Sequence, residues 1–148
     1  METLMHLICP QCQAKNRVAE SDLAKELNCG RCQTNLLPQQ PVALTDASFQ
    51  RYTSGTELPV VVDFWAPWCG PCRMMAPQFE QAAQAMQGQA IFAKLDTEAN
   101  PQTGTALGIR SIPTLAVYVG GREVARKSGA MPAADLQRWV QQVLAGQA

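Results

Sequence analysis

Residues 60–72 read Val-Val-Val-Asp-Phe-Trp-Ala-Pro-Trp-Cys-Gly-Pro-Cys, an apolar run followed at once by two cysteines three positions apart. The run over 58–65 is typical of a strand that is buried on both faces of a sheet. We expect a long helix to follow over 70–86, which places Cys69 and Cys72 on one helix face. Their sulfurs can then form or open a disulfide with little backbone movement. The stretch predicts redox chemistry where a buried strand meets a helix.

The two cysteines are expected to differ in role. A helix N-terminus offers unpaired N–H groups and a positive dipole end, which favour a thiolate over a thiol. Cys69 lies at this tip and is the predicted nucleophile, whereas Cys72 lies one turn further in and is the predicted resolving thiol. Between them, Gly70 permits a close backbone approach and Pro71 stiffens the dipeptide.

Asp63 is an acid in the middle of the apolar strand. A buried carboxylate is costly unless it has a partner or stays protonated. We interpret it as a proton acceptor that helps to deprotonate Cys72. The alternative is an acid at a strand end or edge that faces water.

From about residue 41 onward, strands and helices alternate. The expected strands are 42–44, 58–65, 90–95, 114–119 and 122–127. The expected helices run from Thr45 or Asp46 to about Thr53, over 70–86, over 100–107, and from Pro132 to just before Gly146. Gly120-Gly121 is a two-residue hairpin signal, and Pro77 should kink the long helix. This order predicts a mixed sheet covered by helices.

Several segments together resemble the thioredoxin family over roughly residues 41–148. They are Val62–Arg73, Met75-Ala76-Pro77, Ala93-Lys94-Leu95-Asp96 and Gly108–Thr114. The resemblance implies an α/β thioredoxin fold, a central mixed β-sheet flanked by helices. It implies a protein-disulfide reductase with Cys69 as nucleophile, Cys72 as resolver and Asp63 as buried acid. The expected partners are disulfide-containing proteins and thioredoxin reductase, which recharges the pair with electrons from NADPH.

The resemblance also implies a set of supporting residues. Lys94 is expected near the buried acid, and a cis Ile112-Pro113 bond is expected to face the sulfurs. The neighbouring backbone would bind the substrate strand. The implied substrate groove comprises Trp68, Gly70, Pro71, Ile112, Pro113, Gly129 and Ala130. For the groove residues, the alternative is plain packing or, at Gly129-Ala130, an ordinary loop.

Four more cysteines form two Cys-x-x-Cys pairs, Cys9/Cys12 and Cys29/Cys32, separated by sixteen residues. This spacing is typical of a four-cysteine zinc site. Two extra disulfides, four free thiols and a second redox centre are the alternatives. The segment 9–18 and the second pair resemble zinc-containing members of the thioredoxin family. We expect one structural zinc per chain and no organic cofactor.

The expected division is a zinc-ribbon-like module over 1–38, which holds too little apolar material to fold without metal, and a thioredoxin domain over 39–148. The stretch 36–41, with two prolines and two glutamines, is interpreted as a linker. A redox-sensing interaction module that releases zinc on oxidation is the alternative function. An oxidase or isomerase is disfavoured by Gly70-Pro71 and by an opening segment that does not resemble a signal peptide.

Composition excludes other classes. Of 148 residues, 47% are apolar, and twelve basic and twelve acidic residues give a formal net charge of zero. This balance argues against nucleic acid or an anionic membrane as the main partner. The opening eight residues lack the features of a signal peptide, so we expect a cytoplasmic protein in which cysteines are kept reduced. The expected form is a monomer.

Overall fold

The computed structural model describes residues 3–147; the outer ends of the two expected modules, residues 1, 2 and 148, lie outside this range. A five-stranded mixed sheet has the strand order β3-β5-β4-β6-β7. These strands are β3 (Val42–Leu44), β4 (Val60–Trp65), β5 (Ile91–Asp96), β6 (Thr114–Val119) and β7 (Arg122–Ser128). The first three are parallel and the last two are antiparallel to their neighbours. The predicted mixed sheet is confirmed, with the strand of the apolar run at its centre.

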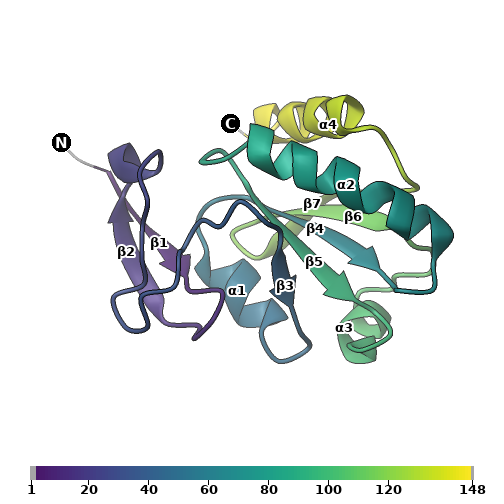
Figure 1. The fold of residues 1–148 in the computed structure, drawn as a ribbon, viewed down its shortest axis with the longest axis horizontal. Helices are drawn as coiled ribbons and strands as arrows, with labels where there is room; N and C mark the ends of the chain where they lie inside the picture. The colour runs from purple at the N-terminus through teal and green to yellow at the C-terminus, as the bar shows by residue number, and fades with distance from the viewer. Residues whose placement is uncertain (1–2, 148) are drawn as a thin grey trace.

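Helices cover both faces of this sheet (Figure 1). They are α1 (Phe49–Gly55), α2 (Gly70–Ala85), α3 (Pro101–Ala106) and α4 (Ala133–Ala145). Successive side chains along β4 point to opposite faces of the sheet, so each one packs against the helices on its own face. Val61 packs in the cluster that contains residues of α2 and α4, whereas Val60, Val62 and Phe64 pack in the cluster that contains α1 residues. Asp63, in phase with Val61, therefore faces α2.

The start of α1 differs from the expectation. Thr45 and Ser48 exchange hydrogen bonds, since each side chain accepts from the other's backbone N–H at 3.0–3.2 Å, and the helix proper begins at Phe49. Asp46 does not cap this helix. Its carboxylate accepts from the N–H groups of Gln102 and Thr103 in α3 instead, because the fold brings that helix N-terminus beside it.

The hairpin and the final helix follow the sequence pattern. Gly120 and Gly121 both have positive φ, at 61° and 80°, as a two-residue hairpin turn requires. Gly121 also lies against Ser54, and a Cβ at this glycine would be 2.7 Å from the serine hydroxyl. The final helix α4 has Pro132 as its N-cap and Gly146 as its C-cap. Within residues 3–147, no helix combines the length and apolar character that a membrane span needs.

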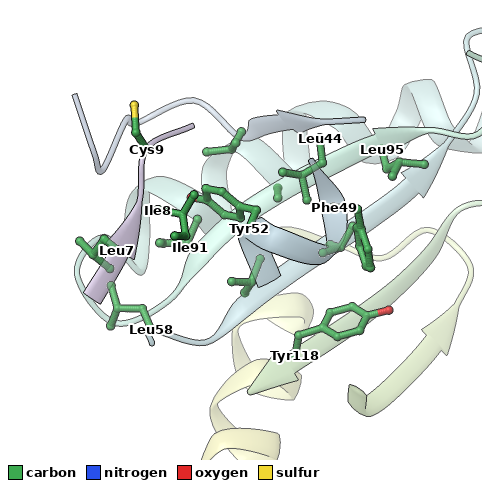
Figure 2. Close-up of a cluster of buried hydrophobic side chains, with 14 of the residues drawn as sticks. Leu7, Ile8, Cys9, Leu44, Phe49, Tyr52, Leu58, Ile91, Leu95 and Tyr118 are labelled. Atoms are coloured by element: carbon green, nitrogen blue, oxygen red, sulfur yellow. The ribbon is translucent and has the colours of Figure 1, made fainter. Parts of the chain in front are cut away.

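The N-terminal segment forms a small hairpin of β1 (Leu4–Ile8) and β2 (Lys15–Ala19), followed by a 3₁₀ turn over Glu20–Asp22. Leu7 and Ile8 are fully buried in the same cluster as Tyr52 of α1 (Figure 2). Ile8 packs so closely on Gly55 that a Cβ at this glycine would be 2.6 Å from the isoleucine Cδ1 atom. The segment thus shares the core of the larger unit.

The stretch 36–41 is not a free linker. Leu36 is 1% exposed and Leu37 is 6% exposed, and both belong to the cluster that β1 joins. The backbone oxygen of Leu37 accepts a hydrogen bond from the side chain of Gln87 at 2.8 Å. The prolines and glutamines suggested a solvated connection, but the two preceding leucines anchor it to the core.

Candidate active site and metal centre

Cys69 and Cys72 form a disulfide at the N-terminus of α2, with their Cα atoms 5.2 Å apart. Cys69 is the N-cap of the helix and has extended backbone angles. Its Sγ accepts a hydrogen bond from the backbone N–H of Cys72 at 3.2 Å. A sulfur in this position is bound by one of the otherwise unpaired amides of the first turn, so negative charge on it is favoured.

The two sulfurs have different surroundings although both residues are buried, Cys69 at 4% and Cys72 at 2% exposure. Cys69 lies 3.7 Å (Sγ to O) from the backbone oxygen of Ile112. Cys72 lines a pocket on the α2 side of the sheet together with Asp63. Trp68 precedes the disulfide and is 66% exposed, and Met74, two residues after Cys72, is 71% exposed.

The Ile112-Pro113 peptide bond is cis, as the resemblance implied. The backbone oxygen of Pro113 accepts a hydrogen bond from the N–H of Gly129 at 2.9 Å, and Gly129 has a positive φ of 102°. Ile112 and Trp68 line a hollow of about 280 Å³ on the α3 side of the disulfide. Of the other expected groove residues, Pro71, Gly129 and Ala130 are exposed and Gly70 is half-buried.

Asp63 is 4% exposed, and its Oδ1 atom has no hydrogen-bond partner among the atoms of residues 3–147. Burial raises the pKa of this carboxyl to about 7, and the opposing effect of the Lys94 ammonium is smaller. Lys94 pairs with Asp63 across β4 and β5, and its Nζ atom lies 5.6 Å from the centre of the Trp65 ring. A carboxyl with this pKa can take up or release a proton near neutral pH.

The pocket that joins Asp63 to Cys72 has a volume of about 80 Å³, and Lys94 and Trp65 also line it. A cavity needs at least about 10–15 Å³ on the same measure to hold one water molecule. The pocket thus has room for water between the carboxyl and the sulfur. Pro41, from the stretch that follows the N-terminal segment, forms part of its wall.

The four remaining cysteines converge at one place. Their sulfurs all lie within 4.8 Å of one another, and none of the four forms a disulfide. Two close contacts join the pairs: 3.5 Å from the sulfur of Cys9 to that of Cys32, and 3.7 Å from the sulfur of Cys12 to that of Cys29. Four thiol sulfurs at this separation could hold a metal ion. His6 is not part of the cluster, because its Nδ1 lies 2.7 Å from Glu57.

Each pair occupies the same kind of backbone turn. The N–H of Gln13 donates to the oxygen of Cys9 at 3.0 Å, and the N–H of Gln33 donates to the oxygen of Cys29 at 2.9 Å. Both glutamines have positive φ, at 64° and 68°, which non-glycine residues rarely adopt. In the sequence, the corresponding signal is the equal offset of the two glutamines from their cysteines.

Sequence reasoning also missed the side chain that joins the two turns. Asn16 donates from Nδ2 to the sulfur of Cys29 at 3.4 Å and accepts from the N–H of Gly30 at 2.9 Å. The Asn16 amide is the largest cause that lowers the pKa of Cys29 to about 6, with further donation from the backbone N–H groups of Cys32 and Arg31. Only the fold of the β1–β2 hairpin brings this asparagine to the second pair.

The cluster is unevenly covered. Cys9 and Cys29 are completely buried, Cys12 is half-buried and Cys32 is exposed. The first turn is also fixed to the larger unit, because Arg51 of α1 donates from Nε to the oxygen of Gln13 at 2.8 Å. Cys32 thus lies on the outer side of the cluster.

Known proteins similar to this chain agree on one family. The profile of the family described as Thioredoxin matches residues 40–142. Thioredoxin C-3 of Corynebacterium nephridii is 49% identical over 140 residues, which cover 95% of this chain and 96% of that protein. A thioredoxin of Alicyclobacillus acidocaldarius subsp. acidocaldarius is 48% identical over 103 residues, covering 70% of this chain and 97% of that protein. A thioredoxin of Synechocystis is 46% identical over 101 residues, covering 68% and 94%.

The lengths of these matches differ in a useful way. The Corynebacterium protein leaves only eight of the 148 residues unmatched, so its similarity extends into the N-terminal segment. The other two proteins match nearly over their whole length and yet cover about two thirds of this chain. About a third of this chain is thus unmatched by either of those two relatives.

Proposed function

This chain belongs to the thioredoxin family, and from that premise we propose that Cys69 is the attacking sulfur of its redox couple and Cys72 the resolving one. The family membership makes the chain a thiol-disulfide oxidoreductase that reduces protein disulfides. One observation carries the assignment of roles: the Cys69 sulfur, at the tip of α2, accepts the N–H of Cys72 at 3.2 Å. This contact and the helix dipole stabilise a thiolate on Cys69.

The proposed reaction transfers two electrons from the reduced pair to the substrate. The Cys69 thiolate attacks one sulfur of a protein disulfide, which forms a mixed disulfide and releases the other substrate sulfur as a thiolate that takes up a proton. Cys72 then loses its proton and attacks the Cys69 sulfur. This step forms the Cys69–Cys72 disulfide and releases the second substrate thiolate.

We propose that Asp63 takes the proton of Cys72 in the second step. Both residues line the 80 Å³ pocket, which has room for a water molecule to carry the proton. The pKa of about 7 makes the carboxyl an effective acceptor near neutral pH. Lys94, beside Asp63 on the next strand, is proposed to stabilise the carboxylate before the transfer.

The substrate chain is proposed to bind across the surface that surrounds Cys69. The exposed ring of Trp68, the Gly70-Pro71 start of α2 and the cis Ile112-Pro113 segment border the sulfur, and Gly129 and Ala130 continue the surface. Family membership implies disulfide-bearing proteins and thioredoxin reductase as partners. We propose that the same surface receives both in turn.

Replacing Cys72 with serine tests the proposed roles. The Cys72→Ser variant should attack a protein disulfide and then stop, because no second sulfur is present to release the substrate. We expect it to accumulate a mixed disulfide with insulin through Cys69, visible by mass spectrometry and reversed by dithiothreitol. The Cys69→Ser variant should form none. Equal trapping by both variants would show that the two sulfurs do not have separate roles.

For the N-terminal segment, we propose that Cys9, Cys12, Cys29 and Cys32 bind one structural zinc ion per chain. Zinc–sulfur bonds of about 2.3 Å in a tetrahedron place the sulfurs roughly 3.8 Å apart. The cross-pair distances of 3.5 and 3.7 Å fit this requirement. When bound, zinc would join the two turns and supply folding free energy that this short segment cannot obtain from apolar burial alone.

Elemental analysis tests the zinc proposal. We expect about one zinc per chain in protein purified under reducing conditions, and less than a tenth of that in Cys29→Ser. A stoichiometric Cys9–Cys12 disulfide in the purified protein would contradict the proposal.

We propose a division of the chain into a metal module over 1–38 and a redox domain over 39–148. The family match to residues 40–142 supports a boundary near this position.

The setting proposed for this reaction is the cytoplasm, where reductants keep six cysteines available for metal binding and exchange. We propose that the protein acts as a monomer. Size-exclusion chromatography with light scattering tests this, with an expected mass near 16.1 kDa for the reduced, metal-loaded chain.

A second candidate function is redox sensing by the metal module, and the exposure of Cys32 favours it. An exposed zinc thiolate can react with an oxidant, and the loss of one ligand weakens metal binding. In this case hydrogen peroxide should release zinc from the Cys69→Ser variant as fast as from the wild type. If release depends on Cys69, the module follows the redox state of the active site instead of sensing the oxidant itself.

A further inference from the structure

Three hydroxyl groups form a directed ring next to the cis bond. The Thr114 hydroxyl donates to the backbone oxygen of Ser111, and the Ser111 hydroxyl donates to the Ser128 hydroxyl at 3.2 Å. The oxygens of Thr114 and Ser128 lie 2.9 Å apart. Since Thr114 has already used its one hydrogen, Ser128 must donate to Thr114. The hydrogen bonds therefore run from the Ser111 hydroxyl through Ser128 and Thr114 to the Ser111 backbone oxygen. Each of the three hydroxyl groups donates its hydrogen within the ring.

This ring encloses the segment that faces the attacking sulfur. Ser111 and Thr114 stand on either side of Ile112-Pro113, and the oxygen of Ile112 lies 3.7 Å from the sulfur of Cys69. Ser128, the last residue of β7, is the cross-strand partner of Thr114 at the end of the β6–β7 ladder. Ser128 thus links the Ile112-Pro113 segment to β7, the strand after the Gly120-Gly121 turn.

The backbone supports the same connection. The N–H of Gly129 donates to the oxygen of Pro113 at 2.9 Å, so the residue after Ser128 also holds the cis segment. Thr114 is buried, whereas Ser111 and Ser128 are exposed. Removing the Ser128 hydroxyl leaves no buried donor unpaired, because Thr114 still donates to Ser111 and water can reach Ser111. The group is thus suited to positioning more than to stability.

We propose that Ser128 is a positioning residue for disulfide exchange with protein substrates: through Ser111 and Thr114, its hydroxyl fixes the Ile112-Pro113 segment opposite Cys69. The inference rests on the proposed binding of substrate chains at this segment. The end of β7 thus supplies a polar contact that positions the segment next to the apolar side chains of Trp68 and Ile112. Small disulfides need no docked chain, so their reduction does not depend on this hydroxyl.

The test compares Ser128→Val with Ser128→Thr, because valine and threonine have the same branched shape and differ in the hydroxyl. With dithiothreitol as the electron donor, we expect Ser128→Val to lower kcat/KM for insulin about fivefold, mainly through KM. Ser128→Thr should stay within twofold of the wild type. Both variants should react with the small disulfide DTNB at the wild-type rate. Amide exchange at Gly129 should be faster in the valine variant than in the threonine variant.

Three outcomes would overturn the inference: wild-type insulin kinetics in both variants, an equal loss in both, or a matching loss of DTNB reactivity in the valine variant. The first denies a role to the hydroxyl, the second indicates a steric effect, and the third places the effect on Cys69 itself. A wild-type protein that reduces DTNB but not insulin would instead refute the proposed function on which the inference rests.

Discussion

The Cys69–Cys72 pair and the two N-terminal pairs have the same Cys-x-x-Cys spacing, but the backbone around them differs. Cys69 caps a sixteen-residue helix, and its sulfur pairs with Cys72 in a disulfide. In the other two pairs, the residue after the second cysteine turns back with positive φ, and the sulfurs approach those of the opposite pair at 3.5 and 3.7 Å. A helix directs two sulfurs to each other, whereas a tight turn directs both outward to a common point. Spacing alone thus does not separate exchange chemistry from metal binding.

The strongest loss of activity is expected for Cys69→Ser, which should abolish disulfide reduction and leave metal binding intact. Cys69→Ser should lower insulin reduction by at least about a thousandfold, because the attacking sulfur is lost. The zinc content should stay at the wild-type level, because the serine lies outside the four-cysteine cluster. Turnover with dithiothreitol and elemental analysis on one preparation measure both. Loss of zinc in this variant would show that the two regions are not chemically separate.

Removing a cysteine of the N-terminal cluster should affect the stability of the whole chain as well as metal binding. Cys29→Ser removes a completely buried sulfur and the partner of the Asn16 amide. Because Leu7 and Ile8 share a core cluster with Tyr52, we expect the loss of zinc to destabilise the whole chain by several kcal/mol. Urea unfolding followed by tryptophan fluorescence and by metal release tests this. Two separate transitions, with the second at the wild-type midpoint, would contradict a shared core.

Within the redox site, Asp63→Asn should slow the resolution of the mixed disulfide by about 10- to 100-fold and leave the first attack within a few fold. The wild-type resolution rate should rise with pH through about 7, where Asp63 loses its proton, and the variant should lack this step. Rapid-quench kinetics with a disulfide peptide separates the two reactions. Equal slowing of both would exclude a base role for Asp63.

The same carboxyl predicts a pH dependence of stability. Its folded pKa lies above its unfolded value, so the folded state binds the proton more tightly. Its contribution is fully present below about pH 4 and is lost as the pH rises to about 7, a change of a few kcal/mol. Asp63→Asn should therefore be more stable than the wild type at pH 8 and similar at pH 4. Urea unfolding at both values measures the difference.

The weakest change is expected at the contact between Gly55 of α1 and Ile8 of β1, which joins the two regions. Gly55→Ala places a Cβ 2.6 Å from the Cδ1 of Ile8, so this side chain must shift. We expect a loss of about 1–3 kcal/mol and faster zinc transfer to a chelator. Gly146→Ala, where the new Cβ meets its nearest atom at 3.4 Å, is the matched control. Unchanged zinc transfer in Gly55→Ala would show that this contact does not support the metal module.

Much of the fold could be predicted from local pattern. The nearly unbroken apolar run of β4, the Gly120-Gly121 turn and the Pro132 start of α4 each correspond to an element of the structure within a few residues. Periodicity and turn chemistry depend on residues that are close in the sequence, so they can be recognised without knowing the tertiary contacts. The pattern failed at Asp46, whose carboxylate binds α3, because a capping acid can serve any helix that the fold brings near.

From the sequence come the three Cys-x-x-Cys pairs, one of them where a helix was expected to begin, and the acid inside the preceding strand. What surrounds those groups depends on how the chain packs. Packing placed Leu36 and Leu37 in a core shared with β1, Asn16 on the sulfur of Cys29, and the hydroxyl of Ser128 on the turn that faces Cys69. These contacts join residues from separate elements, and no local pattern records a contact that exists only after the chain has packed.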